Sequence, residues 1–305
     1  MALPDKCPLC FAGIDSICVV TPHVYGDCEK KRAFFHCSAC DVNFQHPGLS
    51  SDEEKKFYAA EFESFMASRS GIEGGWDNAE KHVLANEDTR VRRMQYLEPH
   101  LKQRGARILE VGCSSGFMLY PLSDLGHQCV GIEPSGVFQK YVQSRNLQVF
   151  DSTENLIQAQ PNTRFDIVMH FFVLEHIREP KQFLESQLKL LNPGGVIIFE
   201  IPNSADPLYS VYDIPAFERF YWSMAHPWYF GEKSLAYLLN QLDRPYEILR
   251  DQRYDLSNHM VWARDGRPGG MARFTDIIGI DVEENYKKGL IKSGRCDTLV
   301  GIVHA

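Results

Sequence analysis

The sequence lacks any long apolar run, because no stretch of its 305 residues reaches the roughly 18 consecutive apolar residues that a membrane-spanning helix requires. The first ten residues also lack the basic segment followed by an apolar segment that marks a secretory signal. We therefore expect a protein without transmembrane helices that resides in the cytoplasm.

Positive charge is also scarce: 32 lysines and arginines face 40 aspartates and glutamates, which gives a formal net charge of −8. Nucleic-acid binding depends on cations that contact phosphates, and anionic membranes attract basic segments. An acidic chain is a poor candidate for either partner. No internal repeat or low-complexity segment is present, and the length is enough to bury a large core without disulfides.

The cysteine count is also not even: the sequence has nine cysteines, which cannot all pair in disulfides. In a cytoplasmic chain, cysteines favour metal binding or free thiols over disulfides. Four of them form two CxxC pairs, Cys7 to Cys10 and Cys37 to Cys40, with 26 residues between the pairs. Each CxxC places two sulfurs on one tight turn, so together they suit tetrahedral zinc. The alternative interpretation is four unrelated reduced thiols.

The segment between the two CxxC pairs is typical of short strands joined by glycine-containing turns, so we predict a zinc ribbon over residues 1–48. Four cysteines fill the coordination sphere of zinc and leave no position for water, which favours a structural over a catalytic metal. This segment has four cations and five anions, a sum of −1 before the metal is counted. That charge argues against a nucleic-acid contact and favours a scaffold or a cap beside the substrate.

Residues 49–104 are expected to form a helical linker and cap. Ser50 followed by three acidic residues predicts a helix start, and aromatic side chains then recur at helical spacing from Phe57. This stripe either belongs to the core or, through Tyr58 and its neighbours, covers a substrate cleft. A second helix is predicted over 79–103, whose arginines indicate a solvated face or an anion site (Arg90, Arg92 and Arg93).

From residue 105 onward, strands and helices alternate. Strands are expected at 108–112, 128–133, 147–150, 165–171 and 195–201, with helices at 117–125, 134–145, 179–191 and 234–242. The alternation predicts an α/β fold: a doubly wound, mostly parallel, Rossmann-like sheet over 105–305, closed by a last strand near 296–304. Insertions are expected at about 203–230 and 257–295.

Such a sheet binds ligands at the carboxyl ends of its strands, near the point where the strand order reverses. The candidates there are the Gly112–Gly116 loop, Glu133 and Asp151. The dinucleotide pattern GxGxxG is absent, and the spacing is instead Glu110-x-Gly112-x-x-x-Gly116. Backbone amides in such a loop suit a ligand carboxylate better than a pyrophosphate, and a carboxylate at Glu133 suits the two hydroxyls of a ribose.

Four segments together resemble the class I S-adenosylmethionine (SAM) dependent methyltransferases. They are ILEVGCSSG (108–116), GIEPS (131–135), FDIVMHFFVLEHIREP (165–180) and LKLLNPGGVIIFEIPN (188–203), and the third and fourth are similar to the ubiquinone-type group. The resemblance implies SAM as cofactor. It also implies a set of cofactor-binding residues: Glu110, Gly112 and Gly116 beside the methionine part, Glu133 at the ribose, Asp151 near the adenine, and His170 and Phe171 on the pocket floor.

The cysteine module before this domain resembles a narrower family, the zinc-containing C-methyltransferases of nucleotide-activated sugars. Residues 173–177 (VLEHI) and 225–230 (AHPWYF) are similar to two of its active-site segments. By that resemblance His226 is the base, His176 lies at the active site and Tyr58 lies over the substrate. The chain departs from the family at Ala225, where the family has glutamate, and in lacking room for a further C-terminal domain.

The sequence thus predicts a SAM-dependent methyltransferase with a small acceptor, a nucleotide-activated sugar or a cell-surface glycan precursor. The expected chemistry is proton removal by His226, supported by His176, although each histidine also fits a purely structural role. Tyr209, Tyr212 and Tyr221 are alternative bases. Arg264 and Arg267 either clamp a diphosphate or lie in an exposed loop. The alternatives for the whole protein are methylation of protein or RNA, or a non-catalytic SAM-binding sensor or partner subunit.

Overall fold

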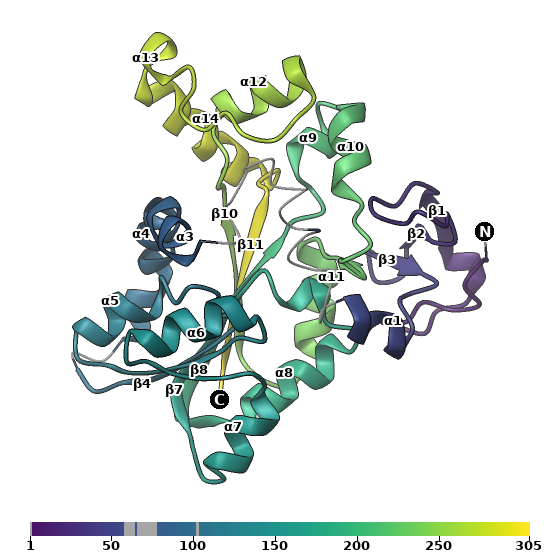
Figure 1. The fold of residues 1–305 in the computed structure, drawn as a ribbon. Coiled ribbons are helices and arrows are strands. Elements are labelled where there is room, and N and C mark those ends of the chain that lie inside the picture. Colours follow the sequence, from purple (N-terminus) through teal and green to yellow (C-terminus); the bar gives the residue numbers. More distant parts are fainter. Residues whose placement is uncertain (1, 58–64, 66–77, 102–103) are drawn as a thin grey trace.

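The computed structural model describes residues 2–57, 65, 78–101 and 104–305. The prediction for Tyr58, most of the aromatic stripe and the end of the predicted helix over 79–103 fall outside this part of the chain. Within it, two β-sheets are present, a large central one and a small one near the N-terminus (Figure 1). None of the described helices combines the length and the apolar character needed to cross a membrane.

The central sheet confirms the predicted α/β fold. Its seven strands run in the order β10-β11-β8-β7-β4-β5-β6, and every neighbouring pair is parallel except those that involve β11. The order reverses at β4, which places the loop after β4 at the switch point. The strands are β4 (Arg107–Val111), β5 (Gln128–Ile132), β6 (Gln148–Phe150), β7 (Phe165–Phe171), β8 (Leu191–Pro202), β10 (Tyr246–Asp251) and β11 (Thr298–His304).

Helices cover both faces of this sheet, as the doubly wound topology requires. One face packs against α4 (Glu87–Leu97), α5 (Leu119–Asp124) and α6 (Gly136–Ser144), and the other against α7 (Thr153–Ala159), α8 (Pro180–Leu188) and α11 (Glu232–Asn240). The sequence did not predict α7 or β10. Helix α7 begins after Ser152, whose hydroxyl caps the helix by accepting a hydrogen bond from the backbone N–H of Asn155 at 3.2 Å.

The single helix predicted over 79–103 is wrong in its continuity. It is divided at Asn86 into α3 (Ala79–Ala85) and α4, which is followed by the short 3-10 helix η3 (Glu98–His100). The Asn86 backbone leaves the helical region, and its side-chain amide donates to the carbonyl O of His82 at 2.8 Å. Asparagine therefore ends one helix and allows a change of direction before the next.

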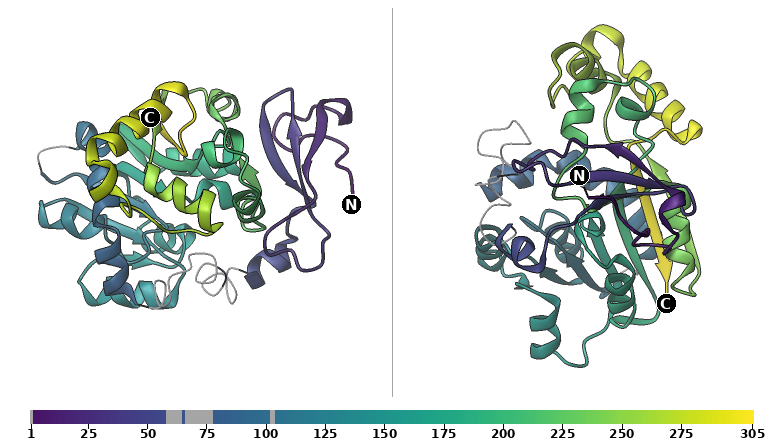
Figure 2. Two further views of the ribbon diagram at one scale, coloured as in Figure 1. Left: turned by 90° about the horizontal axis from the view of Figure 1, so that it is seen from above. Right: turned by 90° about the vertical axis from the view of Figure 1, so that its right-hand side faces the viewer.

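The N-terminal sheet contains a strand from the far end of the chain. Its order is β1 (Ile17–Thr21), β2 (Ala33–Cys37), β3 (Val42–His46) and β9 (Trp228–Tyr229), with Phe44 opposite Trp228. Figure 2 shows this sheet as a lobe beside the central domain. One continuous apolar core nevertheless runs from the cysteine turns through Trp228 and Phe230 to α11 and the central sheet.

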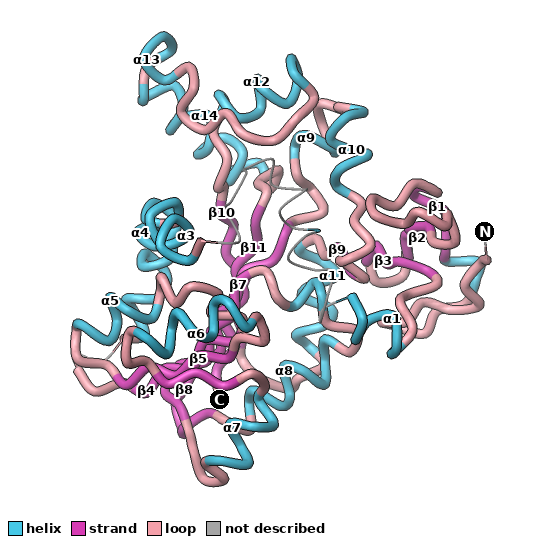
Figure 3. Tube along the Cα trace, viewed as in Figure 1, coloured by secondary structure: helices cyan, strands magenta, loops and turns pink. Residues whose placement is uncertain are grey.

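A group of short helices lies at the end of the sheet into which β8 runs (Figure 3). Its members are α9 (Pro207–Ser210), α10 (Pro215–Tyr221), α12 (Leu256–Asp265), α13 (Thr275–Ile278) and α14 (Ile280–Ser293). An aromatic cluster around Trp222 joins α9, α10 and α12 to the N-terminal sheet. Three further short helices complete the described elements: η1 (Ile14–Ser16), α1 (Ser51–Lys56) and η4 (Leu174–His176). The carboxyl ends of the parallel strands thus lie between the N-terminal sheet and this helical group.

Candidate functional site

The four predicted zinc ligands converge. The Sγ atoms of Cys7 and Cys40 lie 3.7 Å apart, those of Cys10 and Cys37 lie 3.6 Å apart, and all four lie within 4.8 Å of one another. Sulfurs around tetrahedral zinc, with Zn–S bonds of about 2.3 Å, are separated by about 3.8 Å. The sulfur spacing and the all-thiol donor set therefore both fit zinc.

The two cysteine turns have the same local geometry. The N–H of Phe11 donates to the carbonyl O of Cys7 at 3.0 Å, and the N–H of Asp41 donates to that of Cys37 at 2.8 Å. Phe11 and Asp41 both adopt a positive φ, 62° and 63°. The hydrogen bond between the Cys7 and Cys40 side chains lowers the pKa of Cys7 to about 5 and raises that of Cys40. A thiolate, the form that binds metal, is thus favoured within the cluster.

The predicted cofactor loop follows β4 directly. The N–H groups of Gly112 and Cys113 both donate to the carbonyl O of Ile132, at 2.8 and 3.0 Å. Gly112 has a φ of +74°, and a methyl group added to it would lie only 2.8 Å from Cγ2 of Val173. Gly116 also has a φ of +74°. The loop is thus closed against the end of β5 and against the segment after β7, with no room for side chains at its ends.

Glu133, at the end of β5, lies beside this loop. Its two carboxylate oxygens accept the N–H of Ser114 at 2.7 Å and the N–H of Ser135 at 2.8 Å. The carboxylate therefore ties the loop after β4 to the start of α6. A carboxylate only accepts hydrogen bonds, which is the role that the hydroxyls of a ribose require of a partner. Asp151, at the end of the next strand, is exposed and accepts a hydrogen bond from the Asn155 side chain at 2.5 Å.

Glu110 lies on β4, two residues before the loop, and is only 2% exposed. Its Oε2 atom is buried and has no hydrogen-bond partner among the described residues. Burial raises the pKa of this carboxyl to about 8, although the Arg93 charge lowers it. A buried carboxyl without a partner and a loop that requires glycine together form a cradle whose donor and acceptor groups fit the cationic, zwitterionic methionine part of SAM.

His170 and Phe171 lie on opposite faces of β7. Phe171 packs on the α4 side, where the Arg93 guanidinium lies 4.0 Å from its ring centroid. His170 is fully buried on the other side, with its ring stacked on Phe199 at 5.0 Å, and burial lowers its pKa to about 3. The structure does not bring these two side chains together, and His170 has no exposed surface.

Of the three arginines expected to form a solvated face or an anion site, Arg93 is buried and Arg92 is half-buried, and both pair with a buried carboxylate. Arg93 donates through Nε to Glu200 Oε2 at 2.8 Å, Arg92 contacts Oε1 at 2.6 Å, and Tyr96 donates its hydroxyl to the same carboxylate. Glu200 is fully buried on β8; burial raises its pKa, but the two arginines outweigh this and lower it to about 2. The expectation that these arginines lie on the surface is wrong because their partner, Glu200, is more than 100 residues away in the sequence. Arg90 pairs with the exposed Glu87.

His82 is a residue that the sequence did not single out. Its Nδ1 lies 2.8 Å from the hydroxyl of Ser115 in the cofactor loop, and its ring packs against Phe117 and Phe138. Burial lowers its pKa to about 4, so the ring is neutral at physiological pH. Helix α3 is thus fastened to the loop, a contact that no spacing in the sequence indicated.

The two histidines predicted for catalysis do meet. The rings of His176 and His226 lie edge to face with centroids 4.6 Å apart and an interplanar angle of 87°. Nδ1 of His176 lies 2.7 Å from the carbonyl O of Ala225. Because Val173 touches Gly112, the segment that carries His176 is next to the predicted cofactor loop. The geometry therefore places a titratable pair close to where a cofactor would lie.

A small open pocket of about 40 Å³, lined in part by His176, lies at the boundary between the two sheets. One wall comes from the N-terminal segment and the other from the loops that carry the histidines; its lining includes Gln45, Leu49, Glu54, Arg178, Met224 and Ala225. Arg178 donates to Glu54 and to the carbonyl O of Leu49, each at 2.6 Å. The N-terminal module thus forms part of the entrance to the histidine pair.

The three alternative bases are engaged elsewhere. The Tyr221 hydroxyl donates to the carbonyl O of Asn203 at 3.0 Å, Tyr209 stacks on Tyr221, and the Tyr212 hydroxyl lies 2.6 Å from that of Tyr286. Tyr229, which the sequence did not rank, packs against His226 with centroids 5.3 Å apart. Among the described ring contacts, the tyrosine nearest to the histidine pair is therefore Tyr229, three residues after His226.

A second groove of about 270 Å³ lies between the N-terminal sheet and α10 and α12, lined by His23, Tyr25, Arg219, Phe220, Trp262 and Arg267 among others. The rings of Tyr25, Phe220 and Trp262 contact one another in a row. Arg264 is instead paired with Asp265 at 2.6 Å. Of the two arginines predicted as a diphosphate clamp, only Arg267 lines this groove.

Comparison with known proteins shows which family the central domain matches. A family model described as "Methyltransferase domain" matches residues 84–243. A ubiquinone biosynthesis O-methyltransferase of Bradyrhizobium diazoefficiens is 30% identical over 103 residues, which cover 32% of this chain and 41% of that protein. A probable S-adenosylmethionine-dependent methyltransferase of Mycolicibacterium smegmatis is 29% identical over 123 residues, which cover 39% and 48%. The chain thus spans less than half the length of either relative.

A solved structure of a SAM-dependent methyltransferase from Archaeoglobus fulgidus covers 72% of this chain and 94% of its own, with a TM-score of 0.49 and 17% sequence identity. A likeness this distant has no bearing on the substrate. The cysteine module, which lies before residue 84, falls outside the family match.

Proposed function

We infer that this protein transfers a methyl group from SAM to a small acceptor, on the premise that the chain belongs to the methyltransferase-domain family, whose model covers 160 of its 305 residues. The observation that carries the inference is the position of the His176–His226 pair. The segment that carries His176 lies beside the predicted cofactor loop, through the close approach of Val173 to Gly112, and His176 lines the pocket between the two sheets.

The cofactor is proposed to bind at the loop of residues 112–116. Bound SAM supplies a methyl group that its positive sulfur already activates. Glu110 and Glu133 offer carboxyl groups to a cationic ligand, and the Glu133 carboxylate is a hydrogen-bond acceptor suited to ribose hydroxyls. Helix α3 is held against the loop by the hydrogen bond between His82 and Ser115. Asp151 stays a proposal for the adenine end, and Phe171 for the wall near Arg93.

The protein's own part in the reaction is to align the acceptor and remove its proton. We propose that His226 takes the proton from the acceptor hydroxyl or carbon, while His176 positions it. Neutral imidazole is a base matched to physiological pH. His226 is 8% exposed and its neighbours are aromatic, so a proton taken up there is shielded from bulk water. Tyr58 stays a proposal for covering the substrate.

For the acceptor we propose a sugar-containing molecule, with a nucleotide-activated sugar as the first choice. The second groove supports this proposal, because its aromatic side chains offer surfaces that suit a base and the guanidinium groups of Arg219 and Arg267 suit phosphates. The names of the aligned relatives favour a second candidate, a phenolic acceptor of the ubiquinone type. We further propose that Cys7, Cys10, Cys37 and Cys40 hold one structural zinc ion.

The proposal is tested by titration calorimetry with SAM, followed by assay of S-adenosylhomocysteine release on nucleotide sugars and on catechol-type phenols. We expect SAM binding and turnover on one acceptor class. Replacing His226 by asparagine should leave SAM affinity within about twofold and reduce turnover at least ~100-fold, as for a lost general base. Binding without turnover on any acceptor would instead favour a sensor, and no SAM binding would exclude the proposed cofactor.

A further inference from the structure

We propose that Glu175 is a positioning residue whose carboxylate orients the His176–His226 pair and stabilises the imidazolium that forms when the pair takes up the acceptor's proton. The inference rests on the proposed role of His226 as the base, and it adds Glu175 as the residue that supports this base. Nothing in the sequence motifs distinguished Glu175 from the residues around it.

The geometry of three side chains carries this inference. A carboxylate oxygen of Glu175 and one ring nitrogen each of His176 and His226 all lie within 4.8 Å of one another. Glu175 is only 1% exposed, although glutamate is almost never fully buried unless it interacts with another polar or charged group. It lies in η4, one residue before His176, so the backbone that fixes one group also fixes the other.

The hydrogen bond of His176 defines how the pair handles protons. A carbonyl oxygen only accepts hydrogen bonds, so Nδ1 of His176, which faces the carbonyl O of Ala225 at 2.7 Å, carries a hydrogen. In the neutral ring, Nε2 is then the nitrogen that carries no hydrogen. His176 can therefore share a proton with a neighbour through Nε2 while Ala225 holds its ring in one orientation.

The charged groups on the surrounding elements are already neutralised. Arg178, just after η4, pairs with Glu54 of α1 at 2.6 Å. On α8, Lys181 pairs with Glu185 at 3.0 Å, and on β8, Glu200 is held by Arg92 and Arg93. Strand β9 carries no charged residue. Among the described residues of these elements, Glu175 is thus the carboxylate that the two imidazoles face.

The chemistry follows from electrostatics in a buried site. A carboxylate close to an imidazole favours its protonated form, and a carboxylate beside a histidine base fixes the ring and stabilises the imidazolium without itself becoming protonated. In the proposed step, an acceptor O–H or C–H bond breaks and its proton goes to His226. The electron pair left on the acceptor forms the bond to the methyl group as the bond between that methyl and the sulfonium sulfur breaks, and the electron pair of the broken bond stays on the sulfur of the departing S-adenosylhomocysteine. Glu175 compensates the positive charge that remains on the histidine pair.

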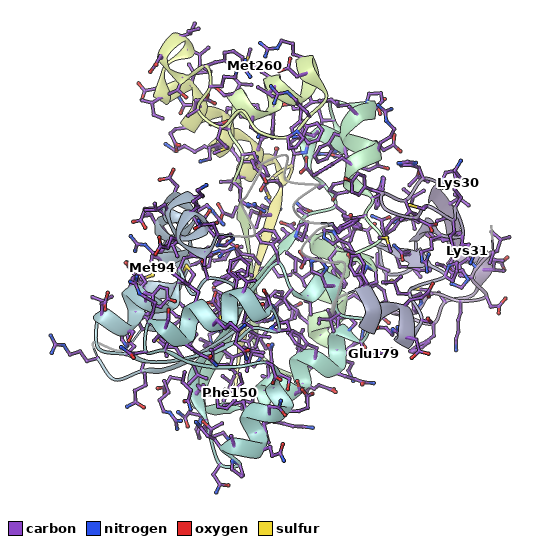
Figure 4. All side chains as sticks on the ribbon, viewed as in Figure 1. Lys30, Lys31, Met94, Phe150, Glu179 and Met260 are labelled. Atoms are coloured by element: carbon purple, nitrogen blue, oxygen red, sulfur yellow. The ribbon has the colours of Figure 1, made fainter. Side chains whose placement is uncertain are left out.

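The test compares Glu175→Gln with Glu175→Asp and with the control Glu179→Gln, using full-length protein. Glu179 lies four residues further on, is exposed, and is at the start of α8 (Figure 4). We expect E175Q to lower kcat at least ~10-fold with little change in KM for the acceptor, and to move the acidic limb of the kcat profile down by about one pH unit. E175D should recover part of the rate, and E179Q should match the wild type.

A direct readout separates this role from a packing role. NMR titration of the His176 and His226 ring protons should show a lower pKa in E175Q than in the wild type, in samples shown to be folded by circular dichroism. Unchanged histidine pKa values would overturn the proposal even if E175Q loses activity. A divalent ion retained by the three side chains, detected by metal analysis of a variant without the four cysteines, would also overturn it. If H226N keeps full turnover, the base assignment fails; if only E175Q behaves as wild type, this inference alone fails.

Discussion

The indole N–H of Trp228 donates to the carbonyl O of Ile177 at 2.9 Å. Trp228 also pairs through its backbone with Phe44 of the N-terminal sheet. Because His226 lies two residues before Trp228 and His176 immediately precedes Ile177, this one tryptophan links the cysteine module to both members of the histidine pair. The cysteine module and the proposed acceptor site are therefore mechanically connected.

Loss of the cysteine cluster is expected to damage turnover more than cofactor binding. Replacing Cys40 by serine should release zinc, lower the melting temperature by several degrees and reduce kcat at least ~10-fold, since the strand after His226 loses its support. SAM affinity should change less than threefold, because the cofactor loop lies on the central sheet. Zinc content, thermal unfolding and calorimetry are the measurements. The exposed Cys18, replaced by serine, is the matched control, and equal zinc content in both variants would contradict the cluster assignment.

The raised pKa of Glu110 predicts a pH-dependent stability. In the unfolded chain this carboxyl titrates near 4.5, whereas in the folded protein its pKa is about 8, so the native state binds the extra proton between these values. The free energy of unfolding should therefore fall as pH rises from about 4.5 through 8. The Glu110→Gln variant lacks this term, so its stability relative to the wild type should increase over the same window, by an amount on the order of a few kcal/mol.

Urea unfolding of the wild type and E110Q at pH 5.5 and pH 8.5 measures this difference. The same variant should bind SAM more weakly, because the cationic ligand loses a partner that ionises on binding. Parallel stability curves for the two proteins across this range would refute the assignment.

Replacing Gly112 by alanine should weaken SAM binding at least ~10-fold. The added methyl group would lie 2.8 Å from Val173 and would also strain a φ of +74°, so either the loop or the segment before η4 must move. The control is Gly136→Ala at the start of α6, where the added carbon meets nothing within 4 Å. Calorimetric titration of both variants is sufficient. A G112A protein that binds as tightly as G136A would show that SAM does not depend on this loop.

The buried pairing of Glu200 predicts a large stability loss on its removal. Glu200→Gln leaves Arg92 and Arg93 without their shared countercharge in the core, which for buried pairs costs about 3–5 kcal/mol. Glu87→Gln, at the start of the helix α4 that carries the arginines, removes only an exposed partner of Arg90 and should have no measurable effect. Chemical unfolding of the two variants tests this contrast. Similar stabilities would indicate that the arginines find other partners or water.

Local patterns in the sequence predicted the elements that are regular over several residues. Strand β7 was predicted at its observed bounds, and the switch-point loop of residues 112–116 was identified from its glycines alone. The two CxxC pairs predicted the convergence of four sulfurs, because their spacing encodes two tight turns. These features depend on neighbours in the sequence, which is why the sequence reveals them.

The features that the sequence did not predict depend on distant partners. Strand β9 has only two residues and no pattern of its own, and it exists because Phe44 and Asn43 offer an open edge. The burial of Arg92 and Arg93 depends on Glu200, and the contact of His82 with Ser115 depends on how α3 folds back over the loop. Likewise, no spacing could indicate that Glu175 and His226, 51 positions apart, share one buried cluster.

Strand β11 has a consequence for the order in which the molecule can fold. It lies in the interior of the sheet between β8 and β10, yet residues 203–297 separate it from β8 in the chain. During synthesis, the apolar edge of β8 that pairs with β11 therefore lacks its neighbour until residues 298–304 have left the ribosome. An exposed strand edge in a nascent chain can pair with strands of other chains. This protein should therefore depend on chaperones, or on rapid insertion of β11 between β8 and β10, more than its compact core suggests.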